Sequence, residues 1–447
     1  MRRFPFRSPL GSLFFSLLLT ACTGTQSESK TGESTEATIA STAPQSSAPA
    51  TIDNPDKIIV PAGFKVSLFA EGVGPARHMV ARSDGTVYVR LSEAREGGCL
   101  VALQDKDKNG QAEVIQGFGD QSCGTGLAID SQYLYYSSKI EIWRQALGKE
   151  AIPTAQPERI AMNLGTPGGH SARSLALDGT GNLYVNIGAP SNSCQVKDRR
   201  PGSLGQQPCE LLNEFGGIWR FKVDQKDQSK TPERRYATGI RNAVAIDWNP
   251  ALKQVFITQH GRDQLDTLFP EHFSAEQNSE LPAEEFVALK QNDNVGWPYC
   301  YYDPIKKQKV LAPEYGGDGS KTGDCAQYKQ PEIGFPAHYA PNDLLFYRGS
   351  QFPKEYHQGA FIAFHGSWNR DQQQQGYQVV FVPFTAGKAG KWDVFASGFA
   401  SDDPNAVISD AGEARYRPMG LAEMPDGSLL VVDSNQGRIW KISYLKP

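Results

Sequence analysis

The strongest constraint on the fold is a short strand motif that recurs along the chain. The segments 84–89, 181–185 and 426–432 each begin with a turn dipeptide and continue with alternating β-branched and aromatic residues. This pattern is typical of a tight turn that leads into a β-strand. A second short apolar segment precedes each copy, so the sequence predicts six units that share one pair of strands. Weaker copies of the motif occur at residues 133–136, 254–257 and 359–363.

Six such units predict an all-β fold, a six-bladed β-propeller of four-stranded antiparallel blades. Residues 57–447 are too many for one ordinary core, and no linker divides them, although a large sandwich or two β-domains would be the alternative. We expect residues 63–69 to pair with 438–444 in the last blade. Helices are expected only near 269–276 and 283–289.

The N-terminus has the features of an export signal. Basic residues precede a short apolar segment within residues 1–21, and Cys22 follows small residues in a pattern that resembles the bacterial lipobox. The alternative is ordinary secretory cleavage. Thr23 is not the aspartate that retains such proteins at the inner membrane, which favours a lipoprotein of the outer membrane facing the periplasm. Residues 22–56 are rich in Ser, Thr and Ala and predict a flexible tether.

The cysteine count agrees with export. Of seven cysteines, Cys22 is assigned to lipidation, and an even number remains for disulfides. Thiol metal binding is the weaker alternative, because no Cys-x-x-Cys pair exists. Several pairings are possible, and proximity in the sequence favours Cys99–Cys123, Cys194–Cys209 and Cys300–Cys325. A net charge of −4 without a basic cluster argues against nucleic acid as a partner.

The loops that enter the blades carry the chemically active residue types. In a propeller these loops converge around one end of the central channel, which we call the mouth. Arginine and histidine recur at these positions, and this predicts an anionic ligand with acid–base chemistry beside it. The residues expected at the mouth are His78, Gly124, Thr125, His170, Arg241, Asn242, His260–Asp263, His338, His365–Arg370, Arg415 and Arg417.

Six ordered motifs at these loops resemble the glucose/sorbosone dehydrogenases, which are six-bladed propellers that use pyrroloquinoline quinone (PQQ). The resemblance covers about residues 60–444 and is closer to the sorbosone dehydrogenase branch than to the soluble glucose dehydrogenases. The motifs are 169–175 (Gly-His-Ser-Ala-Arg-Ser-Leu), 237–242 (Ala-Thr-Gly-Ile-Arg-Asn), 260–263 (His-Gly-Arg-Asp), 294–298 (Asn-Val-Gly-Trp-Pro), 365–370 (His-Gly-Ser-Trp-Asn-Arg) and 417–421 (Arg-Pro-Met-Gly-Leu).

The resemblance implies roles for three residues. His170 would be the general base that takes the proton of the sugar hydroxyl. Arg241 would contact the reacting quinone oxygen, and Asn242 would hold the ring. As alternatives, His170 could hydrogen-bond a blade turn, and Arg241 could pair with a structural carboxylate such as Asp247.

The resemblance also implies the cofactor contacts. Gly261 and Arg262 would ligate Ca²⁺ through main-chain carbonyls, which suit a hard cation. Arg417, Arg415 and Arg370 would bind carboxylates of PQQ. The sequence departs from the glucose enzymes at Gly169, where they have an acidic residue, and their cofactor-binding lysine is unmatched.

These observations lead to one main hypothesis and two alternatives. The main hypothesis is a PQQ- and Ca²⁺-dependent dehydrogenase that oxidises an aldose or a sorbosone-like sugar aldehyde. Its partners would be the sugar, a quinone or soluble redox protein as electron acceptor, and the membrane through the lipid anchor only. One alternative is a metal-dependent propeller lactonase that uses Asp263, Asn242 and Asn369. The other is a non-catalytic propeller lipoprotein that binds a partner or a glycan.

Overall fold

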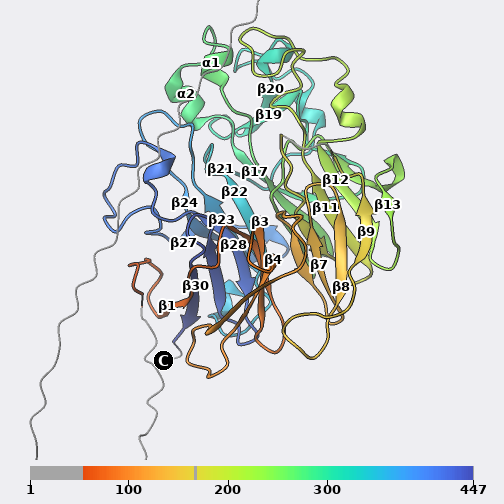
Figure 1. Ribbon diagram of the computed structural model, residues 1–447. Coiled ribbons are helices and arrows are strands. Elements are labelled where there is room, and N and C mark those ends of the chain that lie inside the picture. The colour runs from red at the N-terminus through yellow and green to blue at the C-terminus, as the bar shows by residue number, and fades with distance from the viewer. Residues whose placement is uncertain (1–53, 166–168, 446–447) are drawn as a thin grey trace, which may run out of the picture. The chain divides into compact units, whose positions relative to one another are not determined.

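The protein is a six-bladed β-propeller, as predicted (Figure 1). The computed structural model describes residues 54–165 and 169–445. The predicted signal peptide, Cys22 and nearly all of the predicted tether lie outside these residues. All six predicted strand pairs form the two innermost strands of a blade, and each pair is antiparallel.

Blades 1 to 3 are antiparallel sheets numbered from the channel outward. Blades 2 and 3 each gain a short parallel edge strand, β13 and β18. Blade 1 comprises β2 (Ala76–Ala81), β3 (Val87–Arg95), β4 (Gly98–Gln104) and β5 (Val114–Phe118). Blade 2 comprises β6 (Leu127–Ile129), β7 (Tyr133–Ser137), β8 (Ile142–Ala146), β9 (Glu158–Met162) and β13 (Gln228–Ser229). Blade 3 comprises β10 (Leu175–Leu177), β11 (Asn182–Ile187), β12 (Gly217–Lys222), β14 (Arg235–Thr238) and β18 (Asp293–Asn294).

Blades 4 to 6 have four strands each, and blade 6 closes the ring. Blade 4 comprises β15 (Ala245–Asn249), β16 (Gln254–Gln259), β17 (Glu284–Leu289) and β21 (Ile333–Phe335). Blade 5 comprises β22 (Pro341–Phe346), β23 (Ala360–His365), β24 (Tyr377–Val382) and β27 (Asp393–Ala396). Blade 6 comprises β28 (Pro418–Glu423), β29 (Leu429–Asp433), β30 (Ile439–Tyr444) and β1 (Phe64–Ala70).

The N-terminal strand closes the propeller, and this also moves the predicted domain boundary. β1 pairs with β30 from Phe64 to Ala70, which confirms the predicted pairing of the two ends. Asp56 is buried, and its carboxylate accepts hydrogen bonds from Tyr416 and Trp440. The propeller therefore begins a few residues before residue 57, where the sequence placed the end of the tether.

One hairpin and two short helices gather at one end of the propeller, at the top in Figure 1. The hairpin is formed by β19 (Cys300–Asp303) and β20 (Gln308–Leu311), and the helices are α1 (Leu265–Leu268) and α2 (Ala275–Glu280). The remaining short elements are the hairpin β25 (Phe384–Thr385) and β26 (Lys388–Ala389), and single 3-10 turns at Glu210–Asn213, Pro232–Arg234, Pro313–Tyr315, Cys325–Gln327, Lys354–Tyr356 and Ala411–Glu413.

The prediction of a helix near residues 283–289 is wrong. These residues form β17, in which every side chain is buried. Two adjacent charged residues, Glu284 and Glu285, do not resemble a buried strand in the sequence. Both are buried nonetheless, because each has a polar partner inside the protein. In the other predicted helical region, α2 begins at Ala275, at the end of the interval expected from the sequence.

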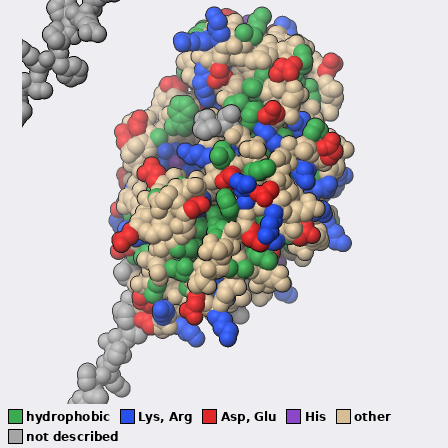
Figure 2. All heavy atoms as spheres, turned by 45° about the vertical axis from the view of Figure 1, so that its right-hand side comes forward, with side chains coloured by type: hydrophobic (Ala, Val, Ile, Leu, Met, Phe, Trp, Pro, Cys, Tyr) green, Lys and Arg blue, Asp and Glu red, His purple; other side chains and the backbone are tan. Residues whose placement is uncertain are grey.

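The three predicted disulfides are confirmed: Cys99–Cys123, Cys194–Cys209 and Cys300–Cys325. Acidic and basic side chains are interspersed over the face drawn in Figure 2. Within the described ranges, no helix has the length and apolar character needed to span a membrane.

Candidate active site

His170 lies at the mouth, just before the innermost strand of blade 3, and its hydrogen bonding suits a base. Its Nδ1 donates to the Ala189 carbonyl at 2.6 Å, in the tautomer that this acceptor requires. Nε2 then carries a lone pair, and it has no hydrogen-bond partner among the described residues. Burial, followed by the positive charge of Arg241, lowers the pKa of His170 to about 3. The imidazole is therefore neutral at physiological pH.

This neutrality gives a direct prediction for the apoprotein. Because the pKa is lowered, the neutral form exists above it, and protonation requires a pH well below the ordinary value of 6.5. The ring ¹⁵N shifts of His170 should therefore stay constant from pH 8 to pH 5. Histidine-labelled protein and NMR would measure this, with the more exposed His272 as an internal reference. A midpoint for His170 between pH 6 and 7 would contradict the prediction.

His170, Arg241 and Asn242 are held together by the residues that follow β11. The Ala189 carbonyl accepts from His170, and the Ala189 N–H donates to the Arg241 carbonyl at 2.8 Å. Gly188 allows this approach, since an added Cβ there would lie 2.7 Å from His170 Cβ and 2.8 Å from Asn242 Oδ1. Asn242 Oδ1 accepts from Asn186, while Asn242 Nδ2 donates to none of the described residues. The structure thus brings His170, Arg241 and Asn242 together at the mouth.

Arg241 forms an ion pair with Asp263, at 2.8 Å between Nη2 and Oδ2. The alternative partner Asp247 is wrong, because Asp247 pairs with Arg348. Burial alone would raise the pKa of Asp263, but Arg241 and then Arg199 hold it below its ordinary value. Asp263 is therefore charged, and it holds the guanidinium of Arg241 in one orientation at the mouth.

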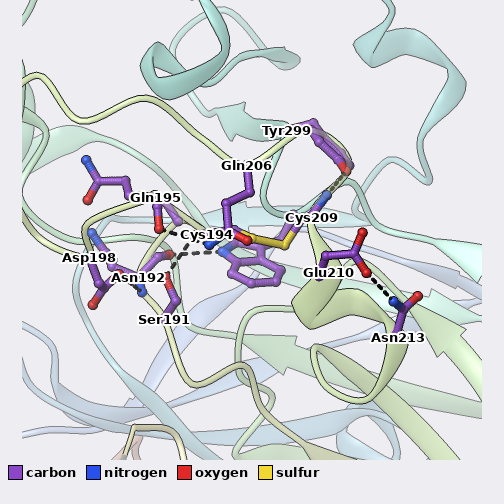
Figure 3. Close-up of a disulfide and its surroundings, with 12 residues drawn as sticks. Ser191, Asn192, Cys194, Gln195, Asp198, Gln206, Cys209, Glu210, Asn213 and Tyr299 are labelled. Carbon is purple, nitrogen blue, oxygen red and sulfur yellow. Dashed lines mark hydrogen bonds between the residues drawn. A yellow bond between two sulfur atoms is a disulfide. The ribbon is translucent and has the colours of Figure 1, made fainter.

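Asn192 bonds Arg241, Asp263 and Trp297, and sequence reasoning missed it. Its carbonyl accepts from Arg241 Nε at 3.2 Å and from Trp297 Nε1 at 2.9 Å. Its Oδ1 accepts from Arg241 Nη2 and from the Asp263 N–H, and its Nδ2 donates to the Asp263 carbonyl. Asn192 lies two residues before the disulfide Cys194–Cys209, as Figure 3 shows, and Trp297 packs against that disulfide.

We expect the change Asn192→Ala to lower the free energy of unfolding by about 1–3 kcal/mol. The variant leaves the Asp263 N–H without its acceptor and removes one of the two acceptors of Arg241 Nη2, which keeps its bond to the Asp263 carboxylate. Denaturant unfolding with the disulfides intact would measure the loss. Asn213→Ala is the matched control, because Asn213 lies on the same insertion with an exposed bond to Glu210. A loss no larger than that of the control would show that the bonds from Asn192 to Arg241 and Asp263 do not stabilise the protein.

Gly261 and Arg262 follow β16 and keep their carbonyl groups free. Neither carbonyl accepts a hydrogen bond from a described residue, so both oxygens are available to a hard cation. The Arg262 side chain turns away into a buried ion pair with Glu314. Glu284 was not found from the sequence: it accepts from the Gly261 N–H at 2.9 Å, and burial raises its pKa to about 8.

The structure separates the three arginines that were expected to bind cofactor carboxylates. Arg417 lies at the mouth, where Nε donates to the His365 carbonyl and Nη2 to the Gly366 carbonyl. Arg415 and Arg370 form other contacts, and their roles in cofactor binding stay predictions. Arg415 pairs with Asp402 and with the carbonyl of Asp56, because its backbone is bonded to the loop after β27. Arg370 is occupied by Glu280 and by the carbonyls of Ser279 and Ala337.

Four other histidines expected at the mouth have fixed partners. His260 Nε2 bonds the Pro341 carbonyl, and His78 Nε2 bonds the Asn342 carbonyl, so each histidine joins its own blade to blade 5. His365 bonds Ser434, and His338 bonds Asn278 and Asn369. His170 differs from these four because its partner Ala189 also binds Arg241.

The residues of the lactonase alternative are bound within the site. Asp263 pairs with Arg241 and accepts from Asn369 Nδ2, while Asn242 Oδ1 accepts from Asn186. Within residues 54–165 and 169–445, the one cluster of three acidic, histidine or cysteine ligands is Asp105, Asp107 and Glu113, in the connection between β4 and β5.

The fold and the mouth together define a class: a six-bladed propeller whose channel opens onto a neutral histidine, arginines and free carbonyls. The chain belongs to the TrAA12-like family, whose sequence model matches residues 58–445. It is 28% identical over 400 residues to an uncharacterised protein of Borreliella burgdorferi, across 87% of this chain and 91% of that protein. It is 30% identical over 284 residues to a pyrroloquinoline quinone-dependent pyranose dehydrogenase of Coprinopsis cinerea, across 57% of this chain and 36% of that longer protein.

Solved structures share the fold. The holo PQQ domain of the Coprinopsis cinerea pyranose dehydrogenase has a TM-score of 0.69 at 19% identity, covering 87% of this chain and 97% of that chain. A calcium structure of a Trichoderma reesei family AA12 enzyme has 0.70 at 18% identity, covering 89% and 98%. The soluble aldose sugar dehydrogenase of Escherichia coli has 0.55 at 17% identity, covering 85% and 99%. The resemblance noted in the sequence is confirmed for this group of propellers, and the sorbosone branch stays a prediction.

Proposed function

We propose that the protein is a PQQ-dependent sugar dehydrogenase. One observation carries the proposal: Ala189 binds both His170 and Arg241, and so places a neutral base beside a fixed guanidinium. The 30% identical relative is named as a PQQ-dependent pyranose dehydrogenase, which supports the same chemistry here.

The residues at the mouth fit PQQ and Ca²⁺. PQQ is a quinone that carries carboxylates, and Arg241, Arg417 and the free Nδ2 of Asn242 offer donors to such oxygens. The carbonyls of Gly261 and Arg262 offer the oxygen ligands that Ca²⁺ prefers. When bound, PQQ would accept the hydride from the sugar carbon.

His170 and Arg241 would perform the remaining chemistry. His170 Nε2 would take the hydroxyl proton. The bond from Nδ1 to the Ala189 carbonyl leaves Nε2 unprotonated and fixes the orientation of the ring. Arg241 would stabilise the negative charge that develops on the quinone oxygen. Asp263 and Asn192 hold the guanidinium of Arg241 in place for this role. Asn242 would bind the ring of the cofactor from the adjacent position.

Reconstitution tests the proposal. Purified protein, stripped of metal and cofactor, would be titrated with PQQ with and without Ca²⁺, followed by absorbance. Dye reduction would then be measured with aldoses, sorbosone-like aldehydes and simple alcohols. We expect PQQ to bind more tightly with Ca²⁺, and a sugar to reduce the dye. A protein that binds no PQQ, or that reduces dye with no sugar, would contradict the proposal.

The finer assignments also belong to this proposal. We propose an aldose or sorbosone-like aldehyde as the substrate, and a quinone or soluble redox protein as the electron acceptor. Export as a lipoprotein, anchored at Cys22 and facing the periplasm, is supported by the three disulfides, which persist in oxidising compartments. Loss of membrane association in a Cys22→Ser variant would support the anchor, and an unchanged distribution would contradict it.

A further inference from the structure

Arg77 is an arginine at the mouth that neither the motifs nor the family resemblance assigned. It lies near the start of β2, the innermost strand of blade 1. Its Nε lies 3.4 Å from Thr125 Oγ1, at the entrance of blade 2. Its two terminal nitrogens donate to no described residue, and no carboxylate of the described chain pairs with it. Four of the five N–H donors of this guanidinium are therefore unused within the protein.

Arg77 is partly buried, and it lacks the partners that fully buried arginines of this protein have. Arg241 pairs with Asp263 and Arg262 with Glu314, while Arg90 and Arg173 donate to main-chain carbonyls. Burial lowers the pKa of Arg77 to about 10, so the group keeps its charge at neutral pH. A cation at the mouth without a counter-charge among the described residues is suited to a ligand that supplies the opposite charge.

The surroundings of Arg77 add positive charge. Blade 6 lies against it, since an added Cβ at Gly420 would come within 2.4 Å of the Arg77 carbonyl. Arg417 at the entrance of that blade also lacks a carboxylate partner for its side chain. Burial, then Arg417 and then Arg77 lower the pKa of His365.

We propose that Arg77 and Thr125 form a carboxylate-binding subsite at the mouth of the propeller. The unused fork of Arg77 matches the two oxygens of a carboxylate, and the Thr125 hydroxyl adds a donor beside it. The carboxylate belongs either to PQQ or to an acidic sugar such as a uronic acid. The inference rests on the proposed function, because it assigns a further binding residue to that site.

Two variants and one control separate these sources. Arg77→Gln removes the charge, and Arg77→Lys keeps the charge but loses the fork. Arg82→Gln is the control, since Arg82 follows the same strand and pairs at the surface with Asp84. PQQ binding would be titrated by absorbance in the presence of Ca²⁺, and steady-state kinetics would compare glucuronate with glucose. Thermal unfolding of each apoprotein would show whether the substitution disturbs the fold.

We expect Arg77→Gln to weaken carboxylate binding by about 10- to 100-fold, with Arg77→Lys between it and the wild type. A weaker PQQ affinity would assign the subsite to the cofactor. A higher KM for glucuronate alone, with PQQ affinity unchanged, would assign it to the substrate. Because the wild-type charge is uncompensated, the Arg77→Gln apoprotein should unfold at the same or a higher temperature, whereas a structural role would lower it.

The outcomes that overturn the inference are distinct from those that overturn the proposed function. A wild-type protein that binds PQQ, with an Arg77→Gln variant unchanged in PQQ affinity and in KM for both sugars, overturns the subsite alone. A wild-type protein that binds no PQQ overturns the proposed function and the subsite with it. A shift of the same size in Arg82→Gln would show a general charge effect and would also overturn the subsite.

Discussion

Replacement of His170 by Gln is expected to lower kcat for sugar oxidation by about 10²- to 10⁴-fold, the contribution of a positioned general base. Gln preserves a polar side chain but cannot accept and carry the hydroxyl proton. The Nδ1 bond to Ala189 leaves Nε2 of the wild-type ring without a proton, as the proposed base requires. Dye-linked steady-state assays on PQQ-loaded protein would measure kcat, and titration of the apoprotein would show PQQ affinity within a few fold of wild type.

His272→Gln is the matched control for this variant. His272 lies between α1 and α2, is more than one-third exposed, and approaches only the neighbouring Glu271. It should leave kcat and PQQ affinity unchanged. If His170→Gln loses PQQ affinity in proportion to activity, His170 is a binding residue and not the base. If it retains more than about a tenth of kcat, another group takes the proton.

The fold was predictable from the sequence because its signal is local. Each blade begins with two strands joined by a tight turn, so the turn dipeptides of segments 84–89 and 181–185 mark the positions where strands pair. The prediction for β17 was wrong because its signal is not local. Glu284 and Glu285 are satisfied by the Gly261 N–H and by Lys309, and neither partner can be inferred from the residues beside them.

The site was predictable only in part. His170, Arg241 and Asn242 sit on loops whose motifs identify them, and the repeat brings these loops to one end of the channel. The partner of Arg241 could not be predicted, because Asp263 reaches it through the loop after β16. Asn192 lies on an insertion that has no repeat equivalent. Arg77 had a signal that was overlooked: the pair Ala76-Arg77 begins β2 in blade 1, and the same pair, Ala172-Arg173, comes just before β10 in blade 3.

Two insertions, one after β11 and one between β16 and β21, link stability to the site. Asn192 in the first bonds Arg241, and Glu314 in the second pairs with Arg262. The two insertions contact each other where the Gly205 N–H donates to the Glu314 carbonyl. They therefore hold the loops from which the cofactor contacts are proposed.

The change Glu314→Ala is expected to lower the free energy of unfolding by about 3–5 kcal/mol, because it leaves the buried charge of Arg262 uncompensated. Both Glu314 oxygens accept from Arg262 Nη1, and Oε1 also accepts from Ser193, while neither side chain of the pair is appreciably exposed. Denaturant unfolding with intact disulfides would measure the loss. Glu332→Ala is the control, since its ion pair with Lys329 is at the surface and should contribute less than about 1 kcal/mol.

A double variant separates the charge effect from loss of packing. In Arg262→Met with Glu314→Leu, apolar side chains of similar volume replace both charges of this pair. Most of the stability lost in Glu314→Ala should therefore be regained. The main-chain carbonyl of residue 262 stays in place in this variant. If Ca²⁺ affinity also returns with stability, the ion pair acts by holding the loop, and the carbonyl is the ligand. If stability returns but Ca²⁺ affinity does not, the side chain of Arg262 contributes directly, and the carbonyl assignment is wrong.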